Sequence, residues 1–441
     1  MGLSNLIFAL FVGAAFYLFR KNVLKIKRNI FLGRDINRSD QPLLRFKTMA
    51  KVALGQSKMV VRPVAGILHI IVYLGFVIIN IEVLEIIIDG LFGTHRVFSF
   101  LGVTYNFLIG SFEILAFLVL VACIVFYIRR NVIRIKRFVM REMDGWPKTD
   151  ANLILLFEVV LMCAFLFMQA ADLTLQNAGA EHYVKAGSFP VSSQIAFLFQ
   201  GMSIDTIHLF ERGFWWFHIL GILAFMNYLP YSKHFHILLA FPNTYFAKLD
   251  AKGAFTNMAS VKAEVEMMMD PSADPYAVPA DDAPSEEPQR FGAKDVTDLN
   301  WVQLMNAYSC TECGRCTSEC PANMTGKLLS PRKIMMDTRD RLEEYGANLD
   351  KHDTVKEEGK FLLDDYISRE ELWACTSCNA CTEACPLNID PLSIILDMRR
   401  YLVMEESAAP TELNGMFTNV ENNGAPWQFP AVDRLNWKDE A

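Results

Sequence analysis

Long apolar stretches constrain this chain more than any other feature of its sequence. Residues 3–19 carry no charge, and four further stretches, 63–88, 105–128, 153–172 and 209–230, are predominantly apolar. A helix needs about 20 such residues to cross the hydrocarbon core of a bilayer. In lipid, only helices and closed barrels satisfy their own backbone hydrogen bonds. The sequence therefore predicts a mainly α fold that contains a bundle of five transmembrane helices.

The first stretch also allows a second interpretation, a cleaved signal peptide. Such a peptide carries its basic residues before the apolar core. Here the basic residues follow the core, at Arg20, Lys21, Lys25 and Lys27. We therefore expect the first stretch to stay in the protein as a helix.

The charges between the stretches predict an orientation. Segments 20–62 and 129–152 hold twelve and seven Lys or Arg residues, whereas segments 89–104 and 173–207 hold one each. Basic loops stay on the cytoplasmic side of a membrane. We expect a multi-pass protein of the bacterial cytoplasmic membrane, with its N-terminus outside and everything after the fifth stretch in the cytoplasm. The net charge of −7 gives no reason to expect nucleic acid as a partner.

Composition divides the chain into four parts. Residues 1–250 form the apolar part, and residues 251–295 form a linker with five prolines and five acidic residues within 271–290. Residues 296–405 hold the clustered cysteines, and 406–441 form a tail. A segment as polar as the linker cannot bury enough surface to fold. We therefore expect a flexible linker that lets the cysteine-rich domain dock rather than fixing it.

Eight of the ten cysteines lie in two matching runs. These are CTECGRCTSECPAN from Cys310 and CTSCNACTEACPLN from Cys375, and both follow the pattern C-x2-C-x2-C-x3-C-P. The pattern is typical of [4Fe–4S] ligands in a reducing compartment. A zinc site is the alternative, but it needs only two C-x2-C pairs and no fourth cysteine followed by proline. We predict two [4Fe–4S] clusters and interpret Cys123 and Cys163 as core residues.

The two runs are expected to exchange their fourth ligands. In two-cluster ferredoxin domains, three closely spaced cysteines hold one cluster and the fourth cysteine of the run binds the other cluster. One cluster is therefore expected on Cys310, Cys313, Cys316 and Cys385. The other is expected on Cys375, Cys378, Cys381 and Cys320. Helices are expected at 331–344, 357–372 and 391–404, followed by a loose tail whose Trp427 and Trp437 are available to a partner.

Histidines in the apolar part suggest a second kind of metal centre. His69 and His236 both lie near the cytoplasmic edge, on different stretches, so that their imidazoles are expected to ligate one haem b. Lys233, one turn before His236, is a candidate contact for a haem propionate, although it also has the position of a lysine that extends to the interface. His218 lies roughly 27 Å from His236 along a continuous helix and would need a second haem. The equivalent position on the second stretch is Ile79, which leaves His208 and His95 as candidate partners.

The last of these stretches resembles a known family. Segment 214–243 reads FWWFHILGILAFMNYLPYSKHFHILLAFPN and is similar to the last membrane helix of the nitrate reductase gamma subunit family of b-type cytochromes. The matching positions are His218, Pro230, Ser232, Lys233 and His236. That family has five helices with the N-terminus outside and two histidines on the second helix. This chain has only His69 there, so the resemblance implies one haem b, with the outer haem in doubt.

Joined to a two-cluster domain, such a membrane part resembles the heterodisulfide-reductase-related membrane iron-sulfur electron-transfer proteins of bacteria. These include oxidoreductases that link electron-transfer flavoprotein to menaquinone. The resemblance implies electron transfer between the quinone pool and a cytoplasmic redox subunit, either electron-transfer flavoprotein or a heterodisulfide-reductase-B-like cysteine-rich protein. Many members carry adjacent cysteine pairs, and this chain has none. The resemblance therefore implies that the catalytic module is missing or lies on another chain.

Three functions stay open from the sequence. The first is an electron conduit between a cytoplasmic partner and quinone, and the second is a haem-free membrane anchor for the cluster domain. The third, a redox-driven ion pump, ranks last because only four acidic residues lie away from the ends of the stretches and no continuous polar chain is visible. These residues are Glu82, Glu85, Glu113 and Glu158. Because quinone reduction takes up protons, Glu158 is the candidate for the quinone site, and Glu113 is a weaker candidate for an outer one.

Overall fold

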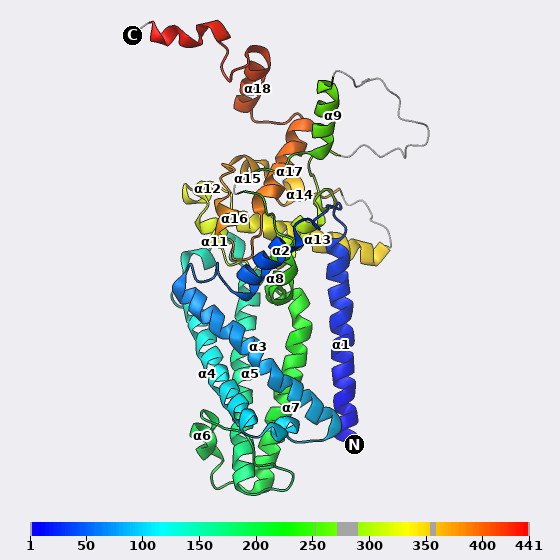
Figure 1. Ribbon diagram of the computed structural model, residues 1–441, viewed down its shortest axis with the longest axis vertical. Helices are drawn as coiled ribbons and strands as arrows, with labels where there is room; N and C mark the ends of the chain where they lie inside the picture. The colour runs from blue at the N-terminus through cyan, green and yellow to red at the C-terminus, as the bar shows by residue number, and fades with distance from the viewer. Residues whose placement is uncertain (1, 252, 271–289, 353–358, 440–441) are drawn as a thin grey trace.

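A computed structural model describes residues 2–251, 253–270, 290–352 and 359–439 of the chain. The described residues form helices and no β-strand, with isolated bridges only at Arg34–Asn300 and Leu363–Ile367. The prediction of a mainly α fold is confirmed. Figure 1 shows a tall bundle of long helices with the short helices of the cysteine-rich domain stacked on one end. We call the opposite end of the bundle, where the N-terminus lies, the distal end.

Within the described ranges, four helices are long and apolar enough to cross a membrane: α1 (Leu3–Ile30), α3 (Pro63–Phe92), α4 (Val103–Asn131) and α5 (Trp146–Asn177). They cover the first four predicted stretches. A further long helix, α7 (Ile204–Tyr228), covers the fifth stretch and packs along α5 and α1. Its first three turns carry Asp205, Glu211 and Arg212, and it does not meet the same criteria. The fifth membrane crossing therefore stays a prediction.

The chain breaks directly after α7, where the sequence predicted a continuous helix to His236. Two short 3-10 turns, η6 (Leu229–Tyr231) and η7 (Lys233–Phe235), separate α7 from α8 (His236–Tyr245). Pro230 lacks the amide hydrogen that a continuing helix needs. Ser232 has extended backbone angles and its side chain accepts a hydrogen bond from the amide of His234. The prediction of one continuous helix was wrong because these local signals end it.

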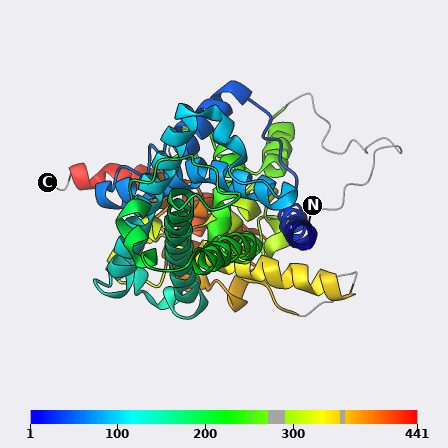
Figure 2. The same ribbon diagram turned by 90° about the horizontal axis from the view of Figure 1, so that it is seen from below.

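Short elements close both ends of the bundle. At the distal end lie η2 (Val97–Leu101), α6 (Ser192–Ile195) and η5 (Ala196–Phe199). At the other end lie α2 (Pro42–Met49), the π-helix η1 (Ala50–Leu54), η3 (Lys136–Phe138) and η4 (Arg141–Met143). Seen along the bundle in Figure 2, α1 stands at its edge. The separate α9 (Ala259–Met269) follows in the segment predicted as linker.

The cysteine-rich domain is built on three helices, α10 (Trp301–Ser309), α13 (Pro331–His352) and α17 (Pro391–Met404). The predicted helix 391–404 is confirmed, and Ile394, Ile395, Met398 and Leu402 are buried as its spacing indicated. Helix α13 is longer than the predicted 331–344. The predicted helix 357–372 begins outside the described residues. Its described part forms two short helices instead of one, and the first of them has non-helical backbone angles at Leu363 and Asp364. The short elements are η8 (Val296–Asp298), α11 (Arg315–Ser318), α12 (Pro321–Met324), α14 (Leu362–Asp365), α15 (Arg369–Trp373) and α16 (Ala380–Ala384).

The cysteine-rich domain packs directly on the bundle rather than standing apart on a tether. Helix α1 continues beyond its apolar stretch, and Asn29 near its end donates a hydrogen bond of 3.1 Å to the Tyr308 hydroxyl. The Trp301 indole donates to the Ile36 carbonyl at 3.1 Å. One continuous set of buried apolar residues runs through both parts. The described residues thus show a fixed contact, where the sequence predicted a domain left free to dock.

The C-terminal segment extends away from the rest of the chain (Figure 1). It forms α18 (Thr411–Asn423) and the 3-10 helix η9 (Ala431–Lys438), neither of which has a buried residue. Trp427 and Trp437 are 50% and 69% exposed. The segment that the sequence predicted as a loose tail thus contains two exposed helices.

Candidate metal centres

The sequence repeat of the two cysteine runs recurs in their backbone. Glu312 and Gly314 in the first run have φ angles of 53° and 69°, and Ser377 and Asn379 in the second have 55° and 60°. Each pair precedes a short helix, α11 or α16, and the two helices pack against one another. A side chain at Gly314 would bring its Cβ within 2.5 Å of Nη1 of Arg332. The left-handed turns fold each run back on itself, so that its cysteines turn toward a common centre.

Four cysteines line one small cavity of about 20 Å³: Cys310, Cys313, Cys316 and Cys385. The fourth comes from the other run, in the crossed arrangement that the sequence predicted. The apolar side chains of Met335, Leu387 and Ile389 complete much of the wall. Among the described residues, no three His, Cys, Asp or Glu side chains meet closely enough to hold a single metal ion. The four thiol groups instead surround the cavity without meeting at a single point.

The other four cysteines also gather. Burial raises the pKa of Cys375, and the neighbouring Cys320 and Cys378 raise it further, whereas the amide of Ser377 and the Arg399 guanidinium lower it. That amide lies 3.4 Å from the Cys375 sulfur. Cys381 is buried and lies within electrostatic reach of Cys375. Because Cys378 is exposed, this second group lies nearer to the surface than the first.

The buried thiols are neutral at pH 7 unless a cation displaces their protons. Burial raises the pKa of Cys310 to about 12 and that of Cys385 to about 11. Bound iron ions reverse this preference, since a coordinating thiol loses its proton. The amide of Ile389 donates to the Cys385 sulfur at 3.4 Å, a contact that favours a charged thiolate. Two groups of four cysteines with apolar walls and amide donors therefore fit two [4Fe–4S] clusters.

His69 and His236 face each other beneath the cysteine-rich domain. Their ring centres lie 6.5 Å apart and the ring planes are tilted by 41°. A metal between two imidazoles, at the roughly 2 Å typical of metal–nitrogen bonds, places the ring centres about 6 Å apart. His236 Nδ1 lies 3.0 Å from the Lys233 carbonyl, which leaves its other nitrogen free. His69 Nδ1 is buried without a partner, a desolvation cost that metal binding would offset. The pair would therefore be able to hold one haem iron between its two rings.

A third histidine, which the sequence reasoning missed, adjoins this pair. The ring of His234 lies 5.5 Å from that of His236 and 5.4 Å from that of Phe225. The alternation of His234 and His236 in the sequence was the available signal. The buried Asp150 of α5, also missed, shapes the turn that carries them. Its carboxylate accepts hydrogen bonds from the Ser232 hydroxyl at 2.6 Å and the Lys233 amide at 3.1 Å.

The side chain of Lys233 has partners within the protein. Its ammonium group forms an ion pair with Glu312, between the first two cysteines of the first run, and donates to the Pro147 carbonyl at 2.6 Å. Glu312 also accepts from Arg339 at 2.8 Å. The side chain of Glu312 is 2% exposed and that of Lys233 is 8% exposed. Lys233 thus forms a buried bridge between the bundle and the first cysteine loop, and its contact with a haem propionate stays a prediction.

The same loop rests on the start of α3. Arg315 donates to the Lys58 carbonyl at 2.9 Å, and lies close enough to His69 to interact with it electrostatically. Arg62, the residue before α3, donates to the Ser318 hydroxyl at 2.8 Å. Hydrogen bonds made by Arg315 and Arg62 thus join the first cysteine loop to the segment that leads into α3, the helix of His69.

Within the part of the chain that the structure describes, no second histidine pairs with His218. His218 Nδ1 lies 3.0 Å from the Leu161 carbonyl, and its ring packs on Phe165. Both ring nitrogens of His95 are occupied, by Asp172 at 2.8 Å and by the Val184 amide at 3.2 Å. His208 lies ten residues before His218 on the same helix and cannot oppose it. The residues present do not fit a second haem.

The two glutamates considered for quinone differ in their surroundings. Glu113 accepts hydrogen bonds from the amides of Val191 and Ser192, at 2.9 and 3.1 Å, and so holds the start of α6. Glu158 is half-buried on α5 beside Cys123 and has no hydrogen-bond partner among the described residues. Glu113 therefore has a structural role, while Glu158 is left free for chemistry.

Comparisons with known proteins agree with the cysteine geometry. A family profile described as a 4Fe-4S dicluster domain matches residues 309–389. The probable iron-sulfur-binding oxidoreductase FadF of Bacillus subtilis is 28% identical over 470 residues, which cover 99% of this chain and 61% of the relative. The EtfAB:quinone oxidoreductase of Syntrophomonas wolfei is 27% identical over 431 residues, 92% of this chain and 55% of the relative. A probable membrane-anchored ferredoxin of Chromohalobacter salexigens is 34% identical over 164 residues, 33% of this chain and 24% of that protein.

No solved structure matches the chain. The chain spans less than two thirds of the length of these curated relatives. Shorter matches include the C and D subunits of heterodisulfide reductases. The matched domain and the relatives define the class of this protein, an iron-sulfur electron-transfer protein of the oxidoreductase type. Its four apolar helices and the membrane-anchored relative indicate a membrane protein.

Proposed function

We propose that this chain is the membrane subunit that passes electrons between a cytoplasmic redox partner and the quinone pool. The observation that carries the proposal is the docking of the first cysteine loop on the start of α3, directly beside His69 and His236. Electron carriers must lie close together to exchange electrons, and this contact joins the first cysteine loop to the segments that carry the two histidines. The exposed Cys378 lies at one end of the proposed route and the membrane histidines lie at the other.

The ligand assignment follows the two groups of cysteines. One [4Fe–4S] cluster is proposed on Cys310, Cys313, Cys316 and Cys385, and the other on Cys375, Cys378, Cys381 and Cys320. A single haem b is proposed on His69 and His236. When bound, these groups supply one-electron carriers whose potentials depend on burial and on hydrogen bonds to their ligands.

The surrounding residues stabilise and orient these ligands. The amides of Ser377 and Ile389 donate to cysteine sulfurs and so stabilise the charged thiolates. The Lys233 carbonyl orients the imidazole of His236, since it accepts the hydrogen bond of Nδ1. Glu312, held between Lys233 and Arg339, keeps the first loop in register with this histidine. The exposed second loop is the natural contact for the soluble partner.

Orientation and partners are part of the proposal. The basic segments lie at the end of the bundle that carries the cysteine-rich domain, which supports a cytoplasmic position for that domain and an outer position for the distal end. The printed name of the Syntrophomonas relative supports electron-transfer flavoprotein and quinone as partners of this class. The heterodisulfide reductase subunits support a cysteine-rich protein as an alternative partner.

Glu158 is our candidate at the quinone site. Quinone reduction consumes protons, and a free carboxyl in a membrane helix can supply them. Among the described residues no hydrogen-bond partner competes for its proton, and Cys123 of α4 lies within electrostatic reach.

Metal content and spectra of the purified full chain test the proposal. Two cubanes require about eight irons per chain in addition to haem iron. The reduced protein is expected to show the sharp optical bands of a low-spin haem b and the electron paramagnetic resonance signals of two reduced clusters. A protein with both clusters and no haem would instead be a membrane anchor for the cluster domain, and the conduit would be refuted.

A further inference from the structure

The distal end of the bundle contains a large polar cavity. Its volume is about 830 Å³, and its lining comes from α1, α3, α5, α7 and the loops between them. Charged side chains dominate the lining, among them Asp89, Arg96, Asp172, Glu211 and Arg212. A cavity that is both roomy and polar holds ordered water, because each water finds several hydrogen-bond partners. We call this space the distal cavity.

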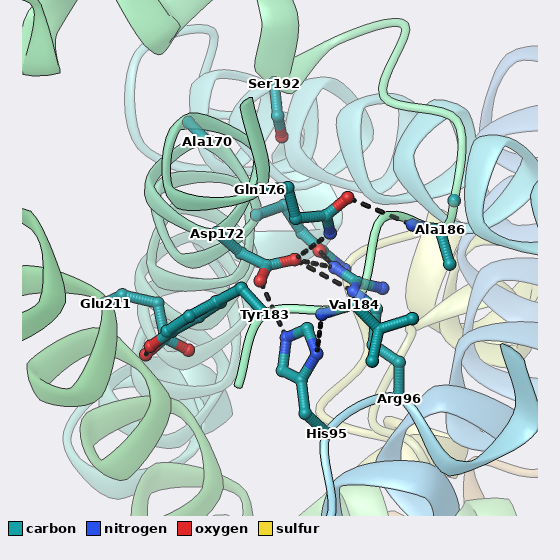
Figure 3. Close-up of polar contacts among 12 residues, drawn as sticks. His95, Arg96, Ala170, Asp172, Gln176, Tyr183, Val184, Ala186, Ser192 and Glu211 are labelled. Atoms are coloured by element: carbon teal, nitrogen blue, oxygen red, sulfur yellow. Dashed lines mark hydrogen bonds and ion pairs between the residues drawn. The ribbon is translucent and has the colours of Figure 1, made fainter. Parts of the chain in front are cut away.

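A continuous chain of polar contacts runs along the cavity, where the sequence had shown none. Figure 3 shows Asp172 of α5 between His95 and Arg96 of the α3–α4 loop. His95 Nε2 lies 2.8 Å from the Asp172 carboxylate, and Arg96 Nε donates to the same carboxylate at 2.9 Å. Arg96 also donates to the side chain of Gln169. The Gln169 side-chain amide in turn donates to Glu82 on α3, where this series of polar contacts ends.

At the end of this series of contacts, one carboxylate oxygen of Glu82 accepts no hydrogen bond from the described residues. Its side chain is 3% exposed and lines the distal cavity, while its Oε2 atom is buried and has no hydrogen-bond partner among the described residues. It lies ten residues before the end of α3, roughly 15 Å below the distal end at the helical rise. A buried carboxylate that keeps one oxygen unpaired is costly, whereas a protonated carboxyl is much less so. The geometry therefore favours a carboxyl that holds a proton.

Each helix around Glu82 contributes charged or titratable groups. Glu85 on α3 accepts from the Tyr105 hydroxyl of α4 at 2.8 Å, and Arg96 donates to that hydroxyl at 3.1 Å. Glu113 of α4 lies within electrostatic reach of Glu82. Helix α5 contributes Asp172, and the Glu211–Arg212 pair of α7 lines the cavity further out. Glu85 and Asp172 are hydrogen-bonded through both carboxylate oxygens, and Glu113, which keeps one oxygen unpaired among the described residues, does not line the cavity. Glu82 both lines the cavity and keeps an unpaired oxygen, so it is the carboxyl of this group that can exchange a proton with the cavity.

We propose that the distal cavity is a proton inlet that ends at Glu82. Water in the cavity carries a proton inward from the distal side, and the proton leaves a hydronium ion to form an O–H bond on the Glu82 carboxylate. The His95–Asp172 pair marks the route at its entrance, and Gln169 and Arg96 hold the inner part in shape. This inference adds a proton route to the proposed electron route, and it holds on whichever side of the membrane the distal end lies.

Cysteine labelling tests the water path. Vesicles of the full-length chain that carry Glu82→Cys are treated with a charged, membrane-impermeant thiol reagent. Thr94→Cys at the exposed rim reports the side from which the cavity opens, and Ile79→Cys, buried on the same helix and outside the cavity lining, is the matched control. A charged reagent reaches a buried thiol only through water. Glu82→Cys, which lines the cavity, is therefore expected to react about tenfold faster than Ile79→Cys, which does not, from the side on which Thr94→Cys reacts. Equal rates would overturn the proposal.

Infrared spectroscopy of the otherwise unaltered chain tests the proton itself. The spectrum is expected to contain a protonated-carboxyl band that disappears in Glu82→Gln and remains in Glu158→Gln. Transfer to heavy water on the distal side should shift this band quickly, and His95→Ala should slow the shift. If Glu82→Gln removes no such band, Glu82 does not hold a proton and the proposal fails even where labelling shows an open cavity.

Discussion

The buried bridge between Lys233 and Glu312 allows a quantitative prediction. Glu312→Gln removes the negative charge shared by Lys233 and Arg339, whose side chains are 8% and 13% exposed. Breaking a buried ion pair costs about 3–5 kcal/mol, because the remaining charge stays desolvated. Glutamine keeps a hydrogen-bond acceptor, so we expect the lower end, about 3 kcal/mol, in the free energy of unfolding of the cysteine-rich domain.

Urea titration of the purified protein in detergent, followed by cluster absorbance, measures this cost. Glu319→Gln is the matched control, because its ion pair with Arg62 joins the same loop to the bundle while the Glu319 side chain is 54% exposed. An exposed pair contributes about 1 kcal/mol or less. If both variants lose the same stability, the first loop does not depend on a buried bridge and the reasoning is refuted.

Four further predictions concern individual residues. Cys320→Ser should damage the cluster held by the second run and spare the first, and electron paramagnetic resonance that shows the reverse would exclude the crossed assignment. His69→Ala and His236→Ala should each abolish the haem spectrum while His218→Ala keeps it, and a wild-type spectrum in either of the first two removes that residue as a ligand. Despite burial, Arg332 and the Ser330 hydroxyl hold the pKa of Glu142 below its ordinary value, so its stabilisation is present above pH of about 4 and is lost as pH falls further. Thermal unfolding between pH 3 and 6 should therefore show a pH dependence that shrinks in Glu142→Gln. Glu158→Gln should slow quinone reduction by the pre-reduced protein, and an unchanged rate with intact cofactors would remove Glu158 from the reaction.

Features encoded by nearby residues could be predicted from the sequence. The cysteine loops depend on spacing within fourteen residues, and helix α17 depends on the periodicity of Ile394, Ile395 and Met398. The position of His69 and His236 at the same depth could also be predicted from the sequence, because the charged loops fix the depth of each histidine. These features need no knowledge of which helices are neighbours.

Features that join distant segments could not be predicted in the same way. Glu312 meets Lys233 across 79 residues, and Asp150 holds the turn at Ser232 across 82. Gln169 and Arg96 connect helices whose contact the apolar pattern does not encode. The polar chain to Glu82 was therefore invisible in the sequence, where each member stands alone among apolar or loop residues.

The central claim is that electrons pass between the exposed cysteine loop and the histidine pair in the membrane. Anaerobic rapid mixing of the full-length protein with a water-soluble one-electron reductant, followed at the haem absorption bands, tests it most directly. The account predicts that the haem is reduced after the clusters, and that Cys313→Ser, which disrupts the first cluster, slows this reduction while His69 and His236 still hold the haem. Haem reduction at the wild-type rate in Cys313→Ser, or a purified protein that contains no haem, would contradict it.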